Sequence, residues 1–223
     1  MKKFLWIMLL TLILNLGVIF SSIASAEEYD ARLRLLANSV DDVLYEIYII
    51  GSNEQLLDSD WIWREHDKYN EIYKGDYYAF ITPATESNLK KQNVHLFGDL
   101  GGATSEGRIN VLNNTRDGVY VVQGKAGQPD LIVSKIQQSG GGQFESRIFV
   151  IKDGSLQLLK LMDKDRRFTE NTYTGFKNIN YLDDGTIAIH WWTNDAMTAG
   201  KYTTVYMLDI KNLVLIGAYT VRR

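Results

Sequence analysis

The residues of this chain that could do chemistry are few and scattered. The sequence has three histidines, His66, His95 and His190, and no cysteine. None of the histidines has a second histidine or a cysteine at the spacing that a zinc site needs. Each histidine is therefore predicted to be structural or superficial, and no metal or other cofactor is expected. The absence of cysteine excludes disulfides and thiol chemistry.

Carboxylate pairs are the second candidate chemistry. Three occur, at positions 58/60, 163/165 and 183/184. Two carboxyl groups flanking a glycosidic bond are what sugar hydrolysis requires, so a secreted carbohydrate-active hydrolase is one alternative. Aspartates are also common in turns, where they accept hydrogen bonds from nearby backbone amides. Turn chemistry is the preferred interpretation of all three pairs, and no G-x-S-x-G nucleophile motif accompanies them.

Aromatic residues give the clearest indication of a binding surface. Trp61 and Trp63 would share one strand face near His66, and a tyrosine-rich segment follows as far as Tyr77 and Tyr78. Exposed rings beside polar groups can stack on sugars or anchor a protein partner. We therefore take Trp61, Trp63, His66, Tyr77 and Tyr78 as candidate ligand-binding residues. The competing interpretation is that these rings pack between sheets.

These residues would have to be positioned by β-strands, because β-branched and aromatic stretches alternate with Gly, Asn and Asp turns. Strands are predicted over residues 43–50, 77–82, 94–97, 109–112, 119–122, 131–136, 146–151, 156–161, 186–192, 202–210 and 213–221. An Asp-Gly turn predicts a hairpin between 109–112 and 119–122, and Lys211-Asn212 predicts one between the last two strands. A short helix over residues 30–38 is left open.

The strands near the C-terminus carry apolar bulk on both faces. Ile187 and Ile189 would share one face with Trp191, while Trp192 lies on the other. Such strands are expected to be covered on both sides, as in stacked propeller blades or a sandwich. The fold class predicted is all-β, a propeller-like stack of three or four antiparallel meander sheets, with a β-sandwich as the alternative.

A short motif carries a resemblance to a known family. The sequence GQPDLIVS at residues 127–134, followed by SGGGQF at 139–144, is similar to FG-GAP/VCBS-type repeats. In those repeats a glycine turn leads into an Asp-Leu-hydrophobic-Val strand, and a glycine-rich loop returns the chain into the next strand. The resemblance covers residues 127–161 well and 186–221 loosely. It implies a propeller-like stack of small sheets on a secreted bacterial protein.

The calcium ligands of that family are missing here. Calcium-binding members have several aspartates in the turn before the strand, because calcium prefers hard oxygen ligands. In this chain the turn at residues 124–129 reads GKAGQP, and only Asp130 remains. No calcium site is therefore carried over.

The N-terminus has the pattern of an export signal. Two lysines at positions 2 and 3 precede an apolar run over residues 4–20, and the sequence ASA at 24–26 is a small-x-small cleavage site. Because that site directly follows the run, cleavage after Ala26 is favoured over an uncleaved membrane anchor. A single β-rich domain over residues 27–223 would then be secreted, periplasmic or held in the cell envelope.

The charge of the chain limits the partners that it could have. The formal net charge is −3, and loss of the two signal lysines would make it −5. A mildly acidic chain with scattered Lys and Arg has no general attraction for nucleic acid or an anionic membrane. We therefore expect an exported, non-catalytic module that binds a protein partner or a cell-envelope glycan. The alternatives are the hydrolase named above and a purely structural exported domain.

Overall fold

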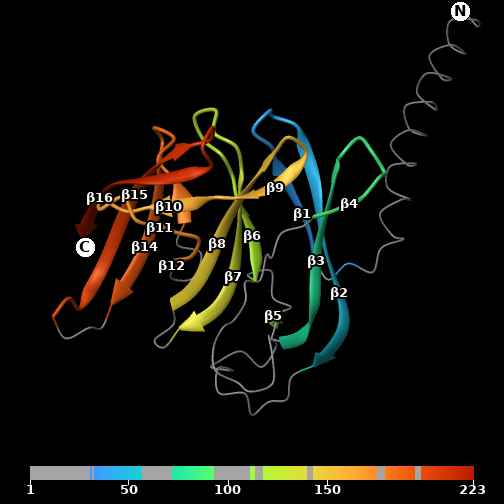
Figure 1. Cartoon of the computed structure of the whole chain (residues 1–223), viewed down its shortest axis with the longest axis horizontal. Coiled ribbons are helices and arrows are strands. Elements are labelled where there is room, and N and C mark those ends of the chain that lie inside the picture. The colour runs from blue at the N-terminus through green and yellow to red at the C-terminus, as the bar shows by residue number, and fades with distance from the viewer. Residues whose placement is uncertain are drawn as a thin grey trace, which may run out of the picture.

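The chain forms three β-sheets that lie side by side (Figure 1). The computed structural model describes residues 31, 33–56, 72–92, 111–113, 118–139, 143–174, 179–193 and 197–223. Within these ranges there is no helix, and hence none that could span a bilayer. The predicted all-β class is confirmed, and none of the three sheets closes on itself through the described strands.

The first sheet is an antiparallel meander with an added short strand. Its members are β1 (Leu33–Asn38), β2 (Leu44–Leu56), β3 (Ile72–Pro83), β4 (Lys90–Lys91) and β5 (Val111–Asn113). The helix left open over residues 30–38 is wrong for residues 33–38, which form β1. Every residue of β1 pairs with β2, from Leu33 opposite Ile49 to Asn38 opposite Leu44. This pairing outweighs the local helical preference of a leucine-rich segment.

The second sheet contains the segment that carries the family resemblance. Its members are β6 (Val119–Val122), β7 (Leu131–Ser139), β8 (Gln143–Lys152), β9 (Ser155–Leu158) and β12 (Thr172–Thr174). The strands predicted over residues 131–136 and 146–151 are confirmed within β7 and β8, which pair antiparallel. Asp153 and Gly154 have φ angles of 51° and 67°. Two successive positive φ angles are typical of the tight turn that joins paired strands, here β8 and β9.

The third sheet is mixed. Its members are β10 (Lys160–Met162), β11 (Phe168–Thr169), β13 (Ile179–Tyr181), β14 (Ile187–Thr193), β15 (Gly200–Asp209) and β16 (Val214–Arg222). The predicted hairpin of the last two strands is confirmed as β15 and β16. The single predicted strand over residues 156–161 is instead divided. Its first part, β9, stays in the second sheet, and β10 pairs in parallel with β16.

The predicted hairpin across residues 113–118 is wrong. β5 pairs with β3 of the first sheet, whereas β6 pairs with β7 of the second. A local Asp-Gly turn signal does not specify the strand partners, and each flanking segment instead adds to a longer neighbour. The strand predicted over residues 94–97 lies outside the described residues.

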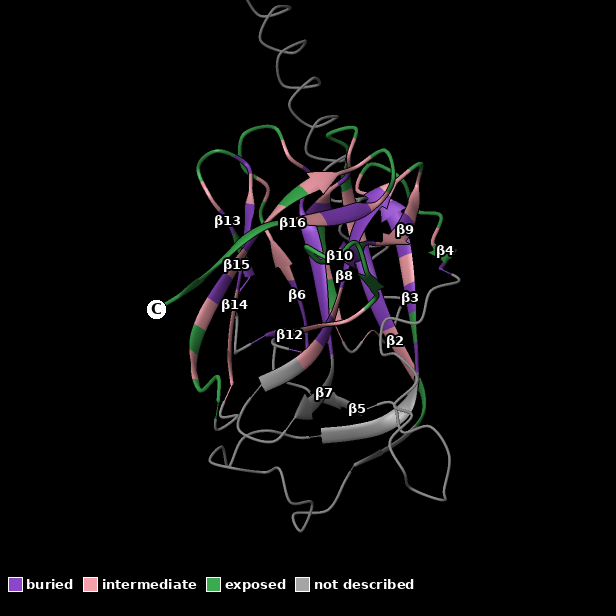
Figure 2. Cartoon of the chain, turned by 60° about the vertical axis from the view of Figure 1, so that its left-hand side comes forward, coloured by how far each residue is buried: buried purple, intermediate pink, exposed green. Residues whose placement is uncertain are grey.

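Two hydrophobic cores separate the three sheets. Consecutive residues of the second sheet contribute to opposite cores: Val119 faces the first sheet and Tyr120 the third, and Phe149 and Ile148 divide in the same way. Figure 2 shows the resulting concentration of buried residues along β7 and β8. The sheet covered on both faces is therefore the second. The prediction that the C-terminal strands are covered on both faces is wrong for part of the third sheet, because Met207 of β15 is 50% exposed.

Candidate binding face

The structure describes only two of the five candidate residues predicted from the sequence. Trp61, Trp63 and His66 lie outside the described residues. Tyr77 and Tyr78 are neighbours on β3, and side chains alternate between the two faces of a strand. Tyr77 is 8% exposed in the core between the first and second sheets, whereas Tyr78 is 40% exposed on the opposite face. Of these two, Tyr78 alone is available to a ligand.

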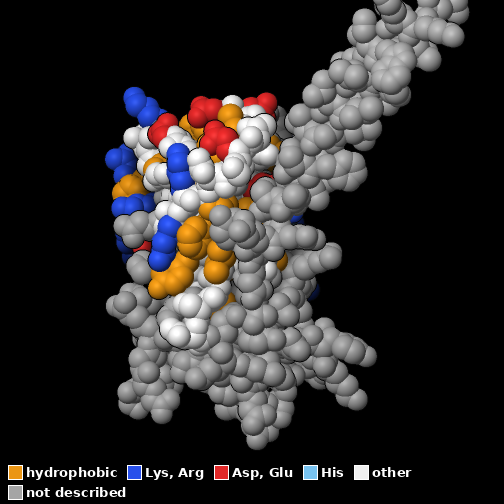
Figure 3. All heavy atoms as spheres, turned by 90° about the vertical axis from the view of Figure 1, so that its right-hand side faces the viewer, with side chains coloured by type: hydrophobic (Ala, Val, Ile, Leu, Met, Phe, Trp, Pro, Cys, Tyr) orange, Lys and Arg blue, Asp and Glu red, His pale blue; other side chains and the backbone are white. Residues whose placement is uncertain are grey.

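Tyr78 belongs to a predominantly apolar face, here called the outer face of the first sheet. Cross-strand pairing places Tyr48 between Arg34 and Phe80, and Phe80 opposite Lys91. Ile50 is opposite Tyr78 in the next row. The members of the face are Arg34, Leu36, Asn38, Leu44, Glu46, Tyr48, Ile50, Tyr78, Phe80, Thr82 and Lys91. Figure 3 looks onto this side of the molecule and shows hydrophobic side chains gathered with lysine or arginine beside them.

Three large apolar side chains of this face reach water. Leu36 is 53% exposed, Leu44 is 42% exposed and Tyr78 is 40% exposed. Between Tyr78 and the two leucines lie Phe80, which is half-buried, and Tyr48, which is only 4% exposed, whereas Ile50 is half-buried opposite Tyr78. Single exposed apolar residues are ordinary on soluble proteins, but several on one sheet face indicate an interaction site.

Cations lie over the rings of this face. The Lys91 ammonium is 3.5 Å from the centroid of the Tyr78 ring, and the Arg34 guanidinium is 5.7 Å from that of Tyr48. Both are within cation–π range. Arg34 also pairs with Glu46, which accepts a hydrogen bond from the Tyr48 hydroxyl. The hydrogen bond to Glu46 raises the pKa of Arg34 above its ordinary value, against the opposing effect of burial.

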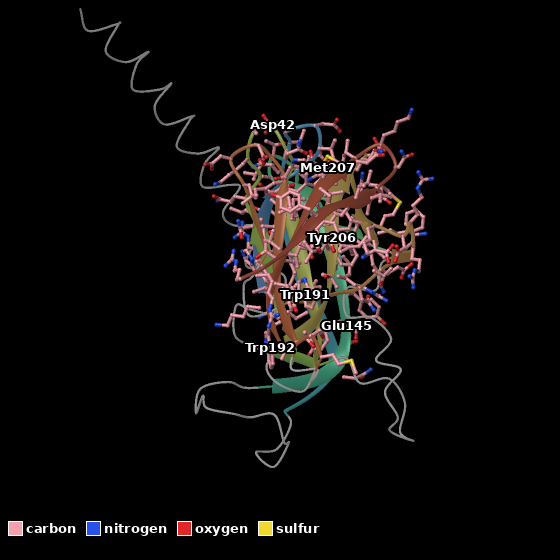
Figure 4. All side chains as sticks on the ribbon, turned by 90° about the vertical axis from the view of Figure 1, so that its left-hand side faces the viewer. Asp42, Glu145, Trp191, Trp192, Tyr206 and Met207 are labelled. Atoms are coloured by element: carbon pink, nitrogen blue, oxygen red, sulfur yellow. The ribbon has the colours of Figure 1, made fainter. Side chains whose placement is uncertain are left out.

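The described tryptophans belong to a different site on the third sheet. Trp191 stacks on Tyr202 with 4.6 Å between ring centroids, and both residues are half-buried. The Trp191 indole N–H donates to the Thr204 hydroxyl, and the Tyr202 hydroxyl donates to the Thr198 carbonyl. Figure 4 shows Trp191 and Trp192 near the same end of β14. For Trp191 the packing interpretation applies, because its polar atom is already bonded within the protein.

His190 is held on the outward face of the third sheet. Its Nδ1 lies 2.8 Å from the Thr203 hydroxyl, and its Nε2 lies 3.1 Å from Asn180 Oδ1. Arg223 approaches Nε2 at 3.3 Å. Partial burial, followed by the Arg223 charge, lowers the pKa of His190 below its ordinary value. Hydrogen bonds to both ring nitrogens support the predicted structural role.

The described carboxylate pairs are engaged in turns. One Asp163 oxygen accepts hydrogen bonds from two backbone amides of its own turn, those of Asp165 and Arg167. Asp184 accepts from the backbone amide and the hydroxyl of Thr186, and these bonds lower the pKa of Asp184. A glycosidase acid needs a raised pKa instead. The pair at positions 58/60 lies outside the described residues.

Asp130 connects separate parts of the chain. It is only 6% exposed, and its two carboxylate oxygens accept from the backbone amides of Asn38 and Gly124, each at 2.7 Å. The Asn38 side-chain amide is a third donor at 3.3 Å. Asp130 thus anchors β1 to the connection before β7. Nowhere in the described ranges do three or more His, Cys, Asp or Glu side chains form a group that could hold a metal ion.

Comparison of the chain with protein-family models, curated proteins and solved structures finds no match. The outer face of the first sheet therefore has to be interpreted from its own chemistry. Sequence reasoning missed Ile50 and Phe80, which lie next to Tyr78, and Leu36 and Leu44, which lie farther along the same face. A signal was present in the sequence, because β1 and β2 carry apolar residues at the outward-facing positions as well as at the core positions. Only the observed strand register, however, assigns these outward residues to one surface.

Proposed function

We propose that this chain is an exported, non-catalytic β-module that binds a protein partner on the outer face of the first sheet. The observation that carries the proposal is that Tyr78 is exposed towards one end of that face, while Leu36 and Leu44 are exposed farther along it. Removing apolar surface from water contributes roughly 25 cal/mol per Å². Tyrosine anchors at the centre of such a surface commonly account for much of the binding energy.

The chemistry of the face favours a protein over a glycan. A sugar presents many hydroxyl groups and needs side chains that hydrogen-bond to them, whereas most of this face is Leu, Ile, Phe and Tyr. Its Arg34 and Glu46 already bond to each other. An apolar protein surface makes fewer such demands, so the protein partner is the better match.

The positive charge of this chain beside Tyr78 indicates a second property of the partner. Lys91 lies over Tyr78, and the adjacent Lys90 is also exposed. Among the described residues neither lysine has an ion-pair partner. Charge complementarity therefore favours a partner with an acidic side chain next to its apolar anchors.

The arrangement of the sheets supports a propeller-like interpretation. Each sheet contains an antiparallel meander, and the first strand of that meander is β1, β6 and β13 respectively. β6 contacts both β1 and β13, so the leading strands adjoin as the innermost strands of propeller blades do. We propose an open, three-bladed relative of the FG-GAP/VCBS-type architecture without its calcium site.

Export remains part of the proposal because of the signal pattern at residues 1–26. N-terminal sequencing of the protein from its native host should begin at Glu27. A chain that begins at Met1 and stays in the membrane fraction would contradict export by cleavage.

Binding can be tested with a display library of short random peptides and with envelope glycan fragments as separate probes. We expect selected peptides to combine aromatic or aliphatic residues with Asp or Glu. A Leu36→Ser/Tyr78→Ser variant should bind them at least tenfold more weakly, whereas Met207→Ser, at a similarly exposed site on the third sheet, should not. Equal binding by both variants, or loss of glycan rather than peptide binding in the first, would overturn the proposal.

A further inference from the structure

One edge of the third sheet is open over most of a strand. β15 pairs with β16 along its length, from Asp209 opposite Val214 to Tyr202 opposite Arg222. On the other side β10 pairs with residues 214–216 and its end lies against Gly217, and none of the described strands flanks residues 218–222 there. Residues 218–223 are all exposed. Figure 2 shows this stretch in the exposed colour, leading to the C-terminal end.

The backbone of this edge is free to pair. The Arg223 amide donates to the Lys201 carbonyl of β15. Antiparallel strands alternate between bonded and non-bonded pairs, so residues 221 and 219 also direct their backbone groups toward β15. Thr220 and Arg222 therefore direct their N–H and C=O groups toward the open edge. Such a row is a template for an added strand.

The edge has few of the features by which proteins prevent such pairing, namely Arg222 near its end and a register shift beside Ala218. The outermost strands β4 and β11 are two residues long, and β4 consists of two lysines. In contrast, the segment GAYTV at residues 217–221 has no Lys, Asp, Glu or Pro. Tyr219 and Val221 on its outward face are 56% and 46% exposed.

We infer that β16 pairs antiparallel with β16 of a second copy of this chain, about a two-fold axis at Thr220. This register places Thr220 opposite Thr220 of the partner subunit, and Thr–Thr pairs are favourable across strands. It places Tyr219 opposite Val221 of the partner subunit twice, which gives two aromatic–β-branched pairs. Arg222 lies opposite Ala218 of the partner subunit, so the register does not bring the two Arg222 charges into direct opposition.

The register can be tested by cross-linking, because the natural chain has no cysteine. Opposed Cα atoms in a bonded antiparallel pair are about 5.5 Å apart, within the range of a disulfide. A Thr220→Cys variant should therefore form a disulfide-linked dimer on mild oxidation, and Leu36→Cys, exposed on the first sheet, should stay monomeric. Equal cross-linking of the two variants, or cross-linking of Leu36→Cys alone, would overturn the inference.

Sedimentation equilibrium provides a second measurement on the mature chain. Thr220→Pro removes the amide donor at the open edge, whereas Thr220→Val keeps it and loses only the hydroxyl contact with Thr204. We expect the valine variant to dimerise like the natural chain. The proline variant should dimerise at least tenfold more weakly with an unchanged β-sheet circular dichroism spectrum. A natural chain that is monomeric at about 1 mM, or a proline variant that folds and dimerises normally, would refute the pairing.

Discussion

Replacing Asp130 should destabilise the fold more than any exposed acid does. In the structure its carboxylate accepts hydrogen bonds from the backbone amide of Asn38, at the end of β1 in the first sheet, and from that of Gly124, in the connection between β6 and β7 of the second sheet. Asp130→Ala leaves both amides without an acceptor. Asp130→Asn keeps one acceptor oxygen but turns an NH2 group toward the other amide.

The expected cost follows from the number of bonds lost. A buried N–H group left without a partner costs about 1–3 kcal/mol. Asp130→Ala should therefore lower the free energy of unfolding by about 2–6 kcal/mol, and Asp130→Asn by about 1–3 kcal/mol. Since a domain has a total stability of roughly 5–15 kcal/mol, the alanine variant would lose a large fraction of it.

Urea unfolding followed by tryptophan fluorescence measures this cost. The midpoint for Asp130→Ala should fall by roughly 1–2 M, with Asp130→Asn between it and the natural chain. Asp183→Ala is the control, because the Asp183 side chain is 98% exposed and its ion pair with Lys125 is superficial. It should change stability by less than about 0.5 kcal/mol. The reasoning fails if Asp130→Ala also stays within about 0.5 kcal/mol of the natural chain.

Three further results are expected. Gly124→Ala should lower the melting temperature strongly, because a Cβ there would lie 2.0 Å from the Gln128 carbonyl oxygen. Gly127→Ala should lower the melting temperature less, because there is open space around the position of its Cβ. The pKa of His190 is lowered in the folded state, so the stability of the fold should decrease as pH falls below about 6.5. Melting curves at about pH 7.5 and about pH 5.5 measure this decrease, and His190→Gln should make it smaller. EDTA should leave the melting temperature nearly unchanged. A large rise in melting temperature on adding calcium would show that the protein has calcium ligands that we did not recognise.

The parts of the fold that could be predicted from the sequence are those determined by neighbouring residues. The antiparallel pairs β7–β8 and β15–β16 each follow from two strand-forming stretches close together in the sequence. The turn between β8 and β9 follows from Asp153 and Gly154, which accept positive φ angles. In each of these pairs the strand that follows directly in the sequence is the partner.

Pairings between distant segments could not be predicted in this way. An Asp-Gly sequence lies between β5 and β6, yet β5 pairs with β3. β1 has a helix-compatible sequence, and its register with β2 decides its conformation. The candidate site shows the same division: aromatic clustering identified Tyr78, but the separation of Tyr77 into the core depends on which face of β3 the second sheet covers.

The parallel pairing of β10 with β16 sets an order for folding during synthesis. Lys160 pairs with Val214, so the backbone of β10 has no neighbour on that side until the final strand has been made. Leu159 and Leu161, which flank Lys160, are already core residues between the second and third sheets. The first two sheets can assemble from residues up to 174, whereas the third also needs residues 214–216, which are synthesised later. Long-range pairing of this kind is slow to form, so the third sheet should be the last of the three to be completed.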